Sequence, residues 1–578
     1  MSGADALTGV ALLLAAGVTL VIGAYGGRFA RTTSDFLVAS RAVGSRWNAA
    51  AISGEYLSAA SFLGVAGLVA KYGADALWYP VGFTAGYLGL LLFVAAPLRR
   101  SGAYTVPDFT EFRLSSRPAR LTAMCVVVCV CVLYLIPQFQ GAGLTLNILL
   151  GVPIWVGAVA VGLIVVVNVV GGGMRSITFV QAFQYWLKLT AIGVPALALV
   201  VVFLGDRQPV GEAAPPRVDQ ATTVDVTTPT VVTVTETDGV RVTGVLDGET
   251  VADAAIPRPG TYTLGEGTVI HLDADAATPV VAGAPTTGSS WISTGGGLGG
   301  AHPLYQVYSI IIATFLGTMG LPHVLVRFYT NPDGRTARRT ALTVIALLGL
   351  FYLFPLLLGV FARLYVPQLL ITGTADAAVL LLPSAAISGF AGQFLGALVA
   401  AGAIAAFLAT SSGLLVSVAG ALSTDVLSGR IRDFRVAAVI GGVIPVILSL
   451  AATSLELSRT VGLVFAVAAS TLCPLLVLGI WWRGLTPAGA ITGLVVGGVS
   501  SGLATSLAIA GVIDDEALGG WPAVIIGYPA AVTVPLAFAT MVAVSLATRR
   551  GVPRDLARTF ARMHVPERVG MGVERLPE

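Results

Sequence analysis

The stretch AAAISGEYLSAASFLGVAG, from Ala49 to Gly67, combines membrane-like hydrophobicity with a single carboxylate, Glu55. A charge at the centre of a bilayer costs about 3 kcal/mol or more, so such a residue needs a partner, water or an ion. Gly54 precedes it and serines surround it, which favours a helix that opens and presents carbonyl and hydroxyl oxygens. We predict a broken transmembrane helix that holds an ion and borders a substrate cavity. An ordinary helix with Glu55 turned to a buried partner is the alternative.

The composition of the 578-residue chain is typical of a membrane protein. Hydrophobic residues make up 56% and charged residues 11% of it, with a mean hydropathy of +0.87, whereas soluble domains carry about 25% charged residues. The four cysteines and four histidines form no pattern of a metal site, a disulfide framework or a Ser/His/Asp set. We therefore predict no enzyme activity, no cofactor and no nucleic-acid partner.

Thirteen apolar segments are long enough to cross about 30 Å of hydrocarbon. They lie near residues 6–26, 47–71, 76–98, 119–150, 153–172, 178–204, 303–326, 340–366, 388–423, 434–454, 459–482, 487–512 and 522–547. Alternation across the membrane places 25 of the 33 basic residues on one side, 7 on the other, and Lys188 within the sixth span. The positive-inside rule then predicts an N-terminus outside and a C-terminus in the cytoplasm, in a bacterial plasma (inner) membrane. Arg327 begins one of the cytoplasmic segments, 327–339.

Residues 205–302 differ from the rest, with 12 acidic and 4 basic residues. The segment TPTVVTVTETDGVRVTGVLDGETV (228–251) alternates β-branched and polar residues, and its two Asp-Gly pairs, at 238–239 and 247–248, are hairpin signals. GTYTLGEGTVIHLDAD (260–275) predicts another hairpin. We expect a small extracellular β-rich insertion, with a disordered acidic loop as the alternative.

Polar side chains also occur inside two other spans. The fourth span contains YLIPQFQGAG, in which Gln138 and Gln140 bring amides to bilayer depth; such amides also join helix to helix. The ninth span carries Thr410, Ser411 and Ser412 in succession. Single hydroxyls usually bond back to their own helix, but three together favour a ligand for a hard cation.

A second interrupted helix is predicted in the seventh span, IIIATFLGTMGLPHVLVRF (310–328), which holds Gly317, Gly320 and Pro322. Spans two to six and seven to eleven thus each open with an interrupted helix, and five spans per group make the two groups opposite in topology. This arrangement is typical of transporters built from inverted repeats. The predicted parts are a first helix and loop (1–46), a first repeat (47–204), the insertion (205–302), a second repeat (303–482), two C-terminal helices (483–548) and a tail (549–578).

Several motifs resemble the sodium:solute symporter family, and most closely its bacterial acetate and monocarboxylate permeases. They are GEYLSAASFLG, YTVPDFTEFRL, YLIPQ, VVGGGMRSITFVQ, FLGTMGLPHVLVRFYT and VGLVFAVAAS, within residues 35–204 and 303–500. The resemblance implies an all-α fold with a LeuT-like core of inverted five-helix repeats and sodium-driven uptake. It assigns sodium ligands to Gly54, Leu57, Ala406, Ala409, Thr410 and Ser411. The permeases have an aspartate at Glu55 and Val-Val-Ala-Gly at 410–413, so this chain departs from them at both places.

Physical reasoning adds roles for the remaining polar groups. A carboxylate substrate is repelled by an ionised Glu55, so this residue is expected to act in coupling, serving the cation or carrying a proton. The substrate needs donors, such as free amides at a half-helix N-terminus. The residues expected at the substrate are Tyr56, Ser58, Ser61, Gln138, Gln140, Thr314 and Thr318.

The function predicted from the sequence is symport of acetate or another short monocarboxylate with sodium as co-substrate, by alternating access. The partners are a small organic anion, sodium and the lipid bilayer, and the chain is expected to be a monomer or a weak oligomer. Three alternatives remain open: a channel or proton-coupled carrier in which Glu55 titrates, symport of another solute such as proline or a sugar, and a sensor. The tail at 549–578 is too short for a kinase domain, which disfavours the sensor.

Overall fold

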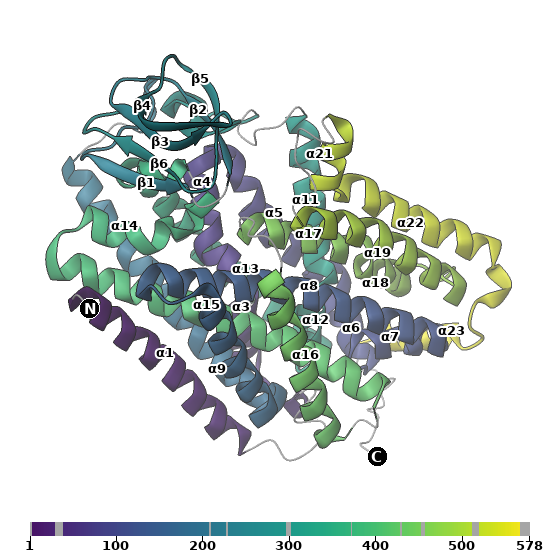
Figure 1. The fold of residues 1–578 in the computed structure, drawn as a ribbon. Helices are drawn as coiled ribbons and strands as arrows, with labels where there is room; N and C mark the ends of the chain where they lie inside the picture. The colour runs from purple at the N-terminus through teal and green to yellow at the C-terminus, as the bar shows by residue number, and fades with distance from the viewer. Residues whose placement is uncertain are drawn as a thin grey trace.

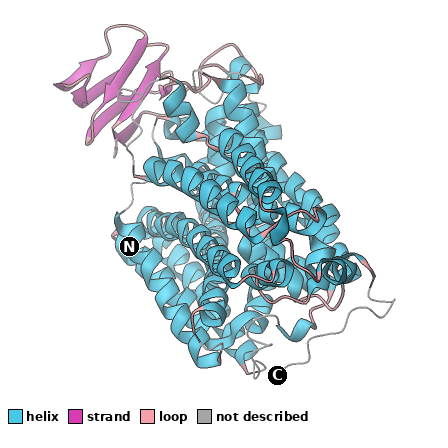
Figure 2. Cartoon of the chain, turned by 90° about the vertical axis from the view of Figure 1, so that its right-hand side faces the viewer, coloured by secondary structure: helices cyan, strands magenta, loops and turns pink. Residues whose placement is uncertain are grey.

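The chain forms one large helical bundle with a small β-sheet at one end (Figure 1). The structure is a computed structural model that describes residues 3–28, 39–206, 210–226, 229–295, 302–371, 373–427, 430–451, 457–510 and 520–566. Figure 2, turned by 90°, shows the sheet standing clear of the helices. Most of the first predicted loop (29–38), part of the return from the insertion (296–301) and the end of the tail (567–578) lie outside the described residues.

Eleven helical segments among the described residues are long and apolar enough to cross a membrane, which confirms a polytopic helical protein. Two of them contain more than one predicted span. The segment Ala60–Ser101 runs from the second span into the third, and α9 joins two helices across a kink at Gly173, where φ is 55°. The count of thirteen stays a prediction.

The helices of the bundle have the following bounds: α1 (Gly3–Gly27), α3 (Ser45–Tyr56), α4 (Val65–Tyr72), α5 (Trp78–Gly89), α6 (Ala95–Ser101), α7 (Val106–Leu114), α8 (Arg117–Leu150), α9 (Ile154–Asp206), α11 (Pro303–Gly320), α12 (Pro322–Tyr329), α13 (Gly334–Tyr365), α14 (Ala378–Ala386), α15 (Gly389–Asp425), α16 (Ile431–Ala451), α17 (Leu457–Ser470), α18 (Leu472–Trp481), α19 (Pro487–Ile509), α21 (Trp521–Gly527), α22 (Ala530–Ala547) and α23 (Leu556–His564).

Burial divides these helices into an inner and an outer set. The part of α15 from Val399 to Ala421 and most of α17 are buried, whereas α1 lies along the outside of α9 and α15. Leu13 and Val21 of α1 are 75% and 68% exposed. A helix that exposes apolar side chains in this way is suited to contact with lipid, because soluble proteins rarely expose large apolar surfaces to water.

The insertion is a folded sheet, so the disordered-loop alternative is wrong. Its strands are β1 (Thr222–Val226), β2 (Thr230–Val234), β3 (Val240–Leu246), β4 (Glu249–Ala255), β5 (Gly260–Leu264), β6 (Thr268–Leu272) and β7 (Val280–Val281). Their order is β1-β6-β3-β5-β2-β7, with β4 paired to β3. Alternate valines and other apolar side chains of these strands form its own small core, as expected for strands buried on one face.

Only one of the predicted hairpins has the expected form. Asp247 and Gly248 have φ of 49° and 85° and connect the paired strands β3 and β4, as in a two-residue turn with both residues left-handed. The turn at Gly239 joins β2 to β3, and β2 pairs with β5 and β7 instead. The hairpin predicted at 260–275 is wrong, because β5 pairs with β2 and β3 while β6 pairs with β1 and β3. Local turn signals locate turns, but strand pairing is decided by the whole sheet.

The insertion is attached to the bundle through Trp291, in the short helix α10 (Gly288–Ile292). The Trp291 indole N–H donates to the carbonyls of Val69 (2.7 Å) and Ala70 (3.1 Å), at the end of α4. Arg363 of α13 lies over the Trp291 ring at 5.3 Å and donates to the carbonyls of Ala70 and Pro285, both at 3.1 Å. The sheet is thereby fixed to α4, the second half of the first interrupted helix.

Both predicted helix interruptions are present. The first separates α3 from a π-helical turn, η2 (Ala60–Gly64), and α4. The second lies at Leu321, whose φ of −70° and ψ of 117° separate α11 from α12. A Cβ on Gly317 would lie 2.5 Å from the Phe465 carbonyl oxygen, and one on Gly320 would lie 2.6 Å from that of Ala468. These glycines let the second interrupted helix lie directly against α17.

Candidate functional site

The break after α3 leaves backbone carbonyls without their helical donors. The N–H of Ser58 would continue the helix by bonding the Gly54 carbonyl, but it donates to Tyr56 O at 2.8 Å. Leu57 follows α3 with φ −71° and ψ 82°, outside the helical region. Carbonyls freed in this way need another partner in a water-poor interior. Gly54 and Leu57 are two of the residues that the resemblance assigns to sodium.

The partner of both carbonyls is Lys188, on α9. Its ammonium donates to the carbonyl oxygen of Gly54 and, at 2.6 Å, to that of Leu57. The side chain is fully buried. Gly54 makes this approach possible, because a Cβ there would overlap the carbonyl of Gln181 on α9. The predicted carbonyl pair therefore converges on one position, and a side-chain cation occupies it.

The other predicted sodium ligands lie on α15, and each of them has different surroundings. The Thr410 hydroxyl donates to the Glu55 carbonyl at 2.6 Å, and the Ala409 carbonyl accepts from Gln181 Nε2 at 2.8 Å. The buried Ser411 hydroxyl has no partner among the described residues. Ala406 is fully buried one turn before Thr410. Their role toward sodium stays a prediction.

Glu55 forms a buried ion pair with Arg327 of α12, with Nε to Oε2 at 2.6 Å. Arg327 also donates to Thr178 Oγ1 at 2.7 Å and to Gln181 Oε1, both on α9. Its side chain is 1% exposed. The assignment of Arg327 to a cytoplasmic loop is therefore wrong: α12 continues the interrupted helix through this residue and carries it to Glu55. Gly413 leaves the space, because a Cβ there would overlap the Glu55 carboxylate.

Two predicted substrate residues meet at the first break. The Tyr56 hydroxyl donates to the Phe83 carbonyl at 3.1 Å and lies 2.8 Å from Thr318 Oγ1. The Tyr56 ring packs edge-on against Tyr87 (4.8 Å between centroids) and Phe465 (6.2 Å). Tyr56 thus joins the two interrupted helices through an aromatic cluster.

The remaining hydroxyls of the predicted substrate set have different surroundings. Ser61 lies 2.9 Å from the Tyr352 hydroxyl of α13, and buried Ser58 interacts with Tyr134 of α8. Thr314 donates back to its own helix, to Ile310 O at 2.7 Å, and lines a small cavity with residues of α5, α17 and α22. Ser58 and Ser61 therefore lie near phenols, while Thr314 lies apart from them.

Gln138 and His323 are buried polar groups without hydrogen-bond partners among the described residues. Both amide atoms of Gln138 and both ring nitrogens of His323 are unpaired, although the two residues are 0% and 1% exposed. The His323 ring lies edge-on to Tyr134, 5.5 Å between centroids. Unpaired buried donors cost about 1–3 kcal/mol each, so such groups call for an explanation, and a bound polar molecule is one. Gln140 is only half-buried.

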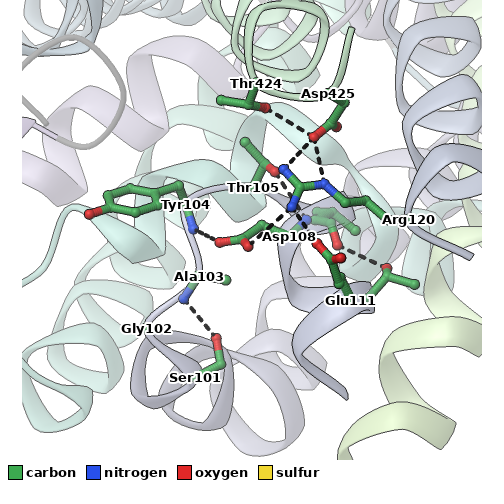
Figure 3. Close-up of polar contacts among 12 residues, drawn as sticks. Ser101, Gly102, Ala103, Tyr104, Thr105, Asp108, Glu111, Arg120, Thr424 and Asp425 are labelled. Carbon is green, nitrogen blue, oxygen red and sulfur yellow. Dashed lines mark hydrogen bonds and ion pairs between the residues drawn. The ribbon is translucent and has the colours of Figure 1, made fainter. Parts of the chain in front are cut away.

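A polar network closes the end of the bundle predicted to face the cytoplasm (Figure 3). Arg120, at the start of α8, donates to Asp425 at the end of α15 (2.7 Å) and to Glu111 of α7 (2.5 Å). It also lies 3.8 Å from Asp108, which accepts from the Tyr104 amide at 2.9 Å. These contacts tie α15 to the corner between α7 and α8.

Sequence reasoning missed the roles of Lys188, Arg327 and His323. The role of Lys188 could have been predicted from the sequence. The polar residues at 178, 181, 184 and 188 recur at helical spacing and mark one polar face of the sixth span. Glu55 also required a partner. Nothing local distinguished Arg327 from the arginines that follow it, and no role was predicted for His323.

A helical membrane protein with two interrupted helices facing each other across buried charges belongs to the class of secondary transporters. Comparison with known proteins agrees. The model of the sodium:solute symporter family matches residues 36–245 and 275–497, and the chain belongs to that family.

Relatives of known sequence extend this result over nearly the full length. The chain is 30% identical to a monocarboxylic acid transporter of Corynebacterium glutamicum, covering 96% of this chain and 94% of the relative. It is 29% identical to an uncharacterized symporter of Bacillus subtilis, covering 98% and 99%. Among solved structures, a Na+-coupled sialic acid symporter in a substrate-bound outward-open state has a TM-score of 0.60 at 13% identity, over 93% of this chain and 98% of the other. The proteins of this family are transporters and not enzymes.

Proposed function

We propose that this protein is a secondary active symporter that takes up acetate or another short monocarboxylate together with a cation. Membership of the family supports coupled transport of a small solute, and the 30% identical relative supports a monocarboxylate. The site supports an anion for an independent reason, which concerns the unpaired donors near α8.

The observation that carries this proposal is the pair of unpaired buried groups, Gln138 and His323. A carboxylate is an acceptor that takes several hydrogen bonds, and an amide N–H, an imidazole N–H and the nearby Tyr134 hydroxyl are donors. Arg327 is already committed to Glu55, Thr178 and Gln181. The anion is therefore bound by neutral donors, away from the ion pair. The other predicted substrate residues remain part of this proposal.

Sodium is the cation expected from the family, with the ligand set of the first interrupted helix and α15. A proton is the second candidate, and one observation favours it: the ammonium of Lys188 bonds to the carbonyls of Gly54 and Leu57.

Counterflow in proteoliposomes tests the substrate without any assumption about the cation. Vesicles are loaded with unlabelled pyruvate, acetate, propionate, proline or glucose, and entry of the labelled compound is followed against protein-free vesicles. Short monocarboxylates should give a transient overshoot, and proline and glucose should not. An overshoot with proline or glucose alone would contradict the proposal.

Variants then locate the site. Gln138→Met and His323→Phe keep side-chain size but remove hydrogen-bonding atoms, at a cost of about 1–3 kcal/mol in substrate binding, or roughly five- to a hundredfold in affinity. Thr122→Val is the matched control on α8, because this hydroxyl only bonds back to Pro118 O at 3.0 Å. Equal affinities for all of these proteins would place the anion elsewhere.

A further inference from the structure

The position at the break of α3 is already filled by a cation that belongs to the chain. Two donors of the Lys188 ammonium point at the carbonyls of Gly54 and Leu57. These oxygens lie at the C-terminal end of α3, which carries the negative end of the helix dipole. An ammonium there satisfies both the orphan carbonyls and the dipole.

A sodium ion and this ammonium cannot occupy the position together. Each carries one positive charge, and two like charges a few ångströms apart repel strongly in a low-dielectric interior. A metal ion also needs several oxygen ligands at once. The two carbonyls that would begin such a shell are bonded to the amine, and the Thr410 hydroxyl is bonded to the Glu55 carbonyl.

No carboxylate among the described residues forms an ion pair with Lys188. Glu55, from α3, acts on the amine electrostatically, but its carboxylate is bonded to Arg327 from α12. The Thr410 hydroxyl of α15 is bonded to the Glu55 carbonyl, and Thr19 of α1 accepts from Gln184, one turn before Lys188 on α9. Of the phenols near the break, Tyr352 of α13 lies against Ser61 and Tyr134 of α8 lies against His323.

The charges of this cluster therefore do not cancel when Lys188 is protonated. Counted in their ionised forms, Glu55 contributes −1 and Arg327 and Lys188 contribute +1 each, so these three side chains sum to +1. Loss of the Lys188 proton makes the cluster neutral. A buried charge without an ionic partner is costly, and release of a proton is the simplest way to remove it.

We propose that Lys188 takes the place of the sodium ion at the break, and that the co-transported cation is a proton carried by this amine. This inference rests on the proposed function for its substrate. The protonated amine holds the carbonyls of Gly54 and Leu57. On the cytoplasmic side the N–H bond gives its proton to water, the neutral amine retains the lone pair, and its hold on the carbonyls weakens. Water on the outer side returns a proton before the next substrate enters. One proton crosses per cycle and no other reactant is consumed.

Sodium binding tests the inference without a substrate. Purified protein in detergent is titrated with labelled sodium, using wild type, Lys188→Ala and Lys71→Arg, which changes the only other lysine of the chain. Wild type and Lys71→Arg should bind no sodium saturably, whereas Lys188→Ala frees the two carbonyls and should gain saturable binding. Saturable binding by wild type, or no gain in a folded Lys188→Ala protein, would overturn the inference.

Transport provides the second readout, in sodium-free proteoliposomes. An inward gradient of one pH unit supplies about 1.4 kcal/mol per proton, enough for about tenfold accumulation of a co-transported substrate. Wild type and Lys71→Arg should accumulate pyruvate under this gradient and acidify the lumen, beyond protein-free vesicles. Lys188→Ala should lose this accumulation. Lys188→Arg, which keeps the charge but cannot release a proton, should lose it as well.

The two tests separate failure of this inference from failure of the proposed function. If no monocarboxylate shows counterflow in wild type, the proposed substrate is wrong, and the sodium titration still decides the role of Lys188. If counterflow is present but accumulation follows a sodium gradient at equal pH, the substrate stands and proton coupling through Lys188 is overturned. Accumulation by Lys188→Ala under the pH gradient would overturn it as well.

Discussion

Removing Arg327 should destabilise the protein more than removing any exposed arginine. Its side chain is 1% exposed and pairs with a Glu55 carboxylate that is 2% exposed, at 2.6 Å. Arg327→Met strands that carboxylate and also removes the bonds to Thr178 and Gln181. Loss of one partner from a buried ion pair costs about 3–5 kcal/mol in the free energy of unfolding.

A double-mutant cycle separates the pair from the general effects of each substitution. Glu55→Gln keeps the shape of the side chain and leaves Arg327 without its counter-charge, so it should also cost about 3–5 kcal/mol. The double variant Glu55→Gln/Arg327→Met has no stranded charge at this position. It should be less destabilised than the sum of the single variants by about 2–3 kcal/mol.

The assay is chemical unfolding of the purified protein in detergent, followed by tryptophan fluorescence. Arg217→Met in the insertion is the matched control, because its pair with Glu236 has side chains that are 40% and 42% exposed, and exposed pairs contribute about 0–1 kcal/mol. The reasoning is refuted if Arg327→Met costs no more than Arg217→Met, or if the costs of Arg327→Met and Glu55→Gln simply add.

Three further predictions address other parts of the structure. Gly413→Ala places a Cβ in the space of the Glu55 carboxylate, and it should lower thermal stability and transport together. A melting temperature equal to that of wild type would contradict this prediction. Deleting 212–290 with a short Gly/Ser bridge should leave uptake intact as long as Trp291 keeps its place; lost uptake by the folded deletion would show that the sheet has a role in transport. Thr410→Val should leave transport as insensitive to sodium as in wild type, because the Lys188 ammonium occupies the break; an apparent sodium constant raised roughly five- to a hundredfold by this change would show that sodium binds there.

The sequence predicted the fold through features that act locally or along one helix. The Gly-rich run around Glu55 and the Gly317–Pro322 run predicted both interruptions, since glycine, proline and a buried charge each weaken a membrane helix. The β-rich texture predicted the insertion. Pairing of β5 with β2 and β3 could not be predicted from turn residues, because it depends on contacts between strands distant in the chain.

The candidate site was predicted in part. The sequence placed Gly54 and Glu55 at the break and the resemblance added Leu57, but the identity of their partners depends on how α9 and α12 pack against α3. Arg327 and Lys188 are both basic residues close to the break in space, and periodicity alone does not decide which one meets the carboxylate and which one meets the carbonyls. In the structure, Arg327 bonds to the Glu55 carboxylate, and Lys188 bonds to the carbonyls of Gly54 and Leu57.

Accumulation of pyruvate against its own gradient tests the central claim, coupled symport, most directly. Proteoliposomes with equal pyruvate on both sides receive an inward proton gradient or, separately, an inward sodium gradient, and internal pyruvate is measured over time against protein-free vesicles. The account predicts a rise of internal pyruvate above the external concentration under one of the gradients, and under the proton gradient if Lys188 carries the cation. Internal and external pyruvate that stay equal under both gradients, in vesicles that show counterflow, would identify a passive carrier and contradict the account.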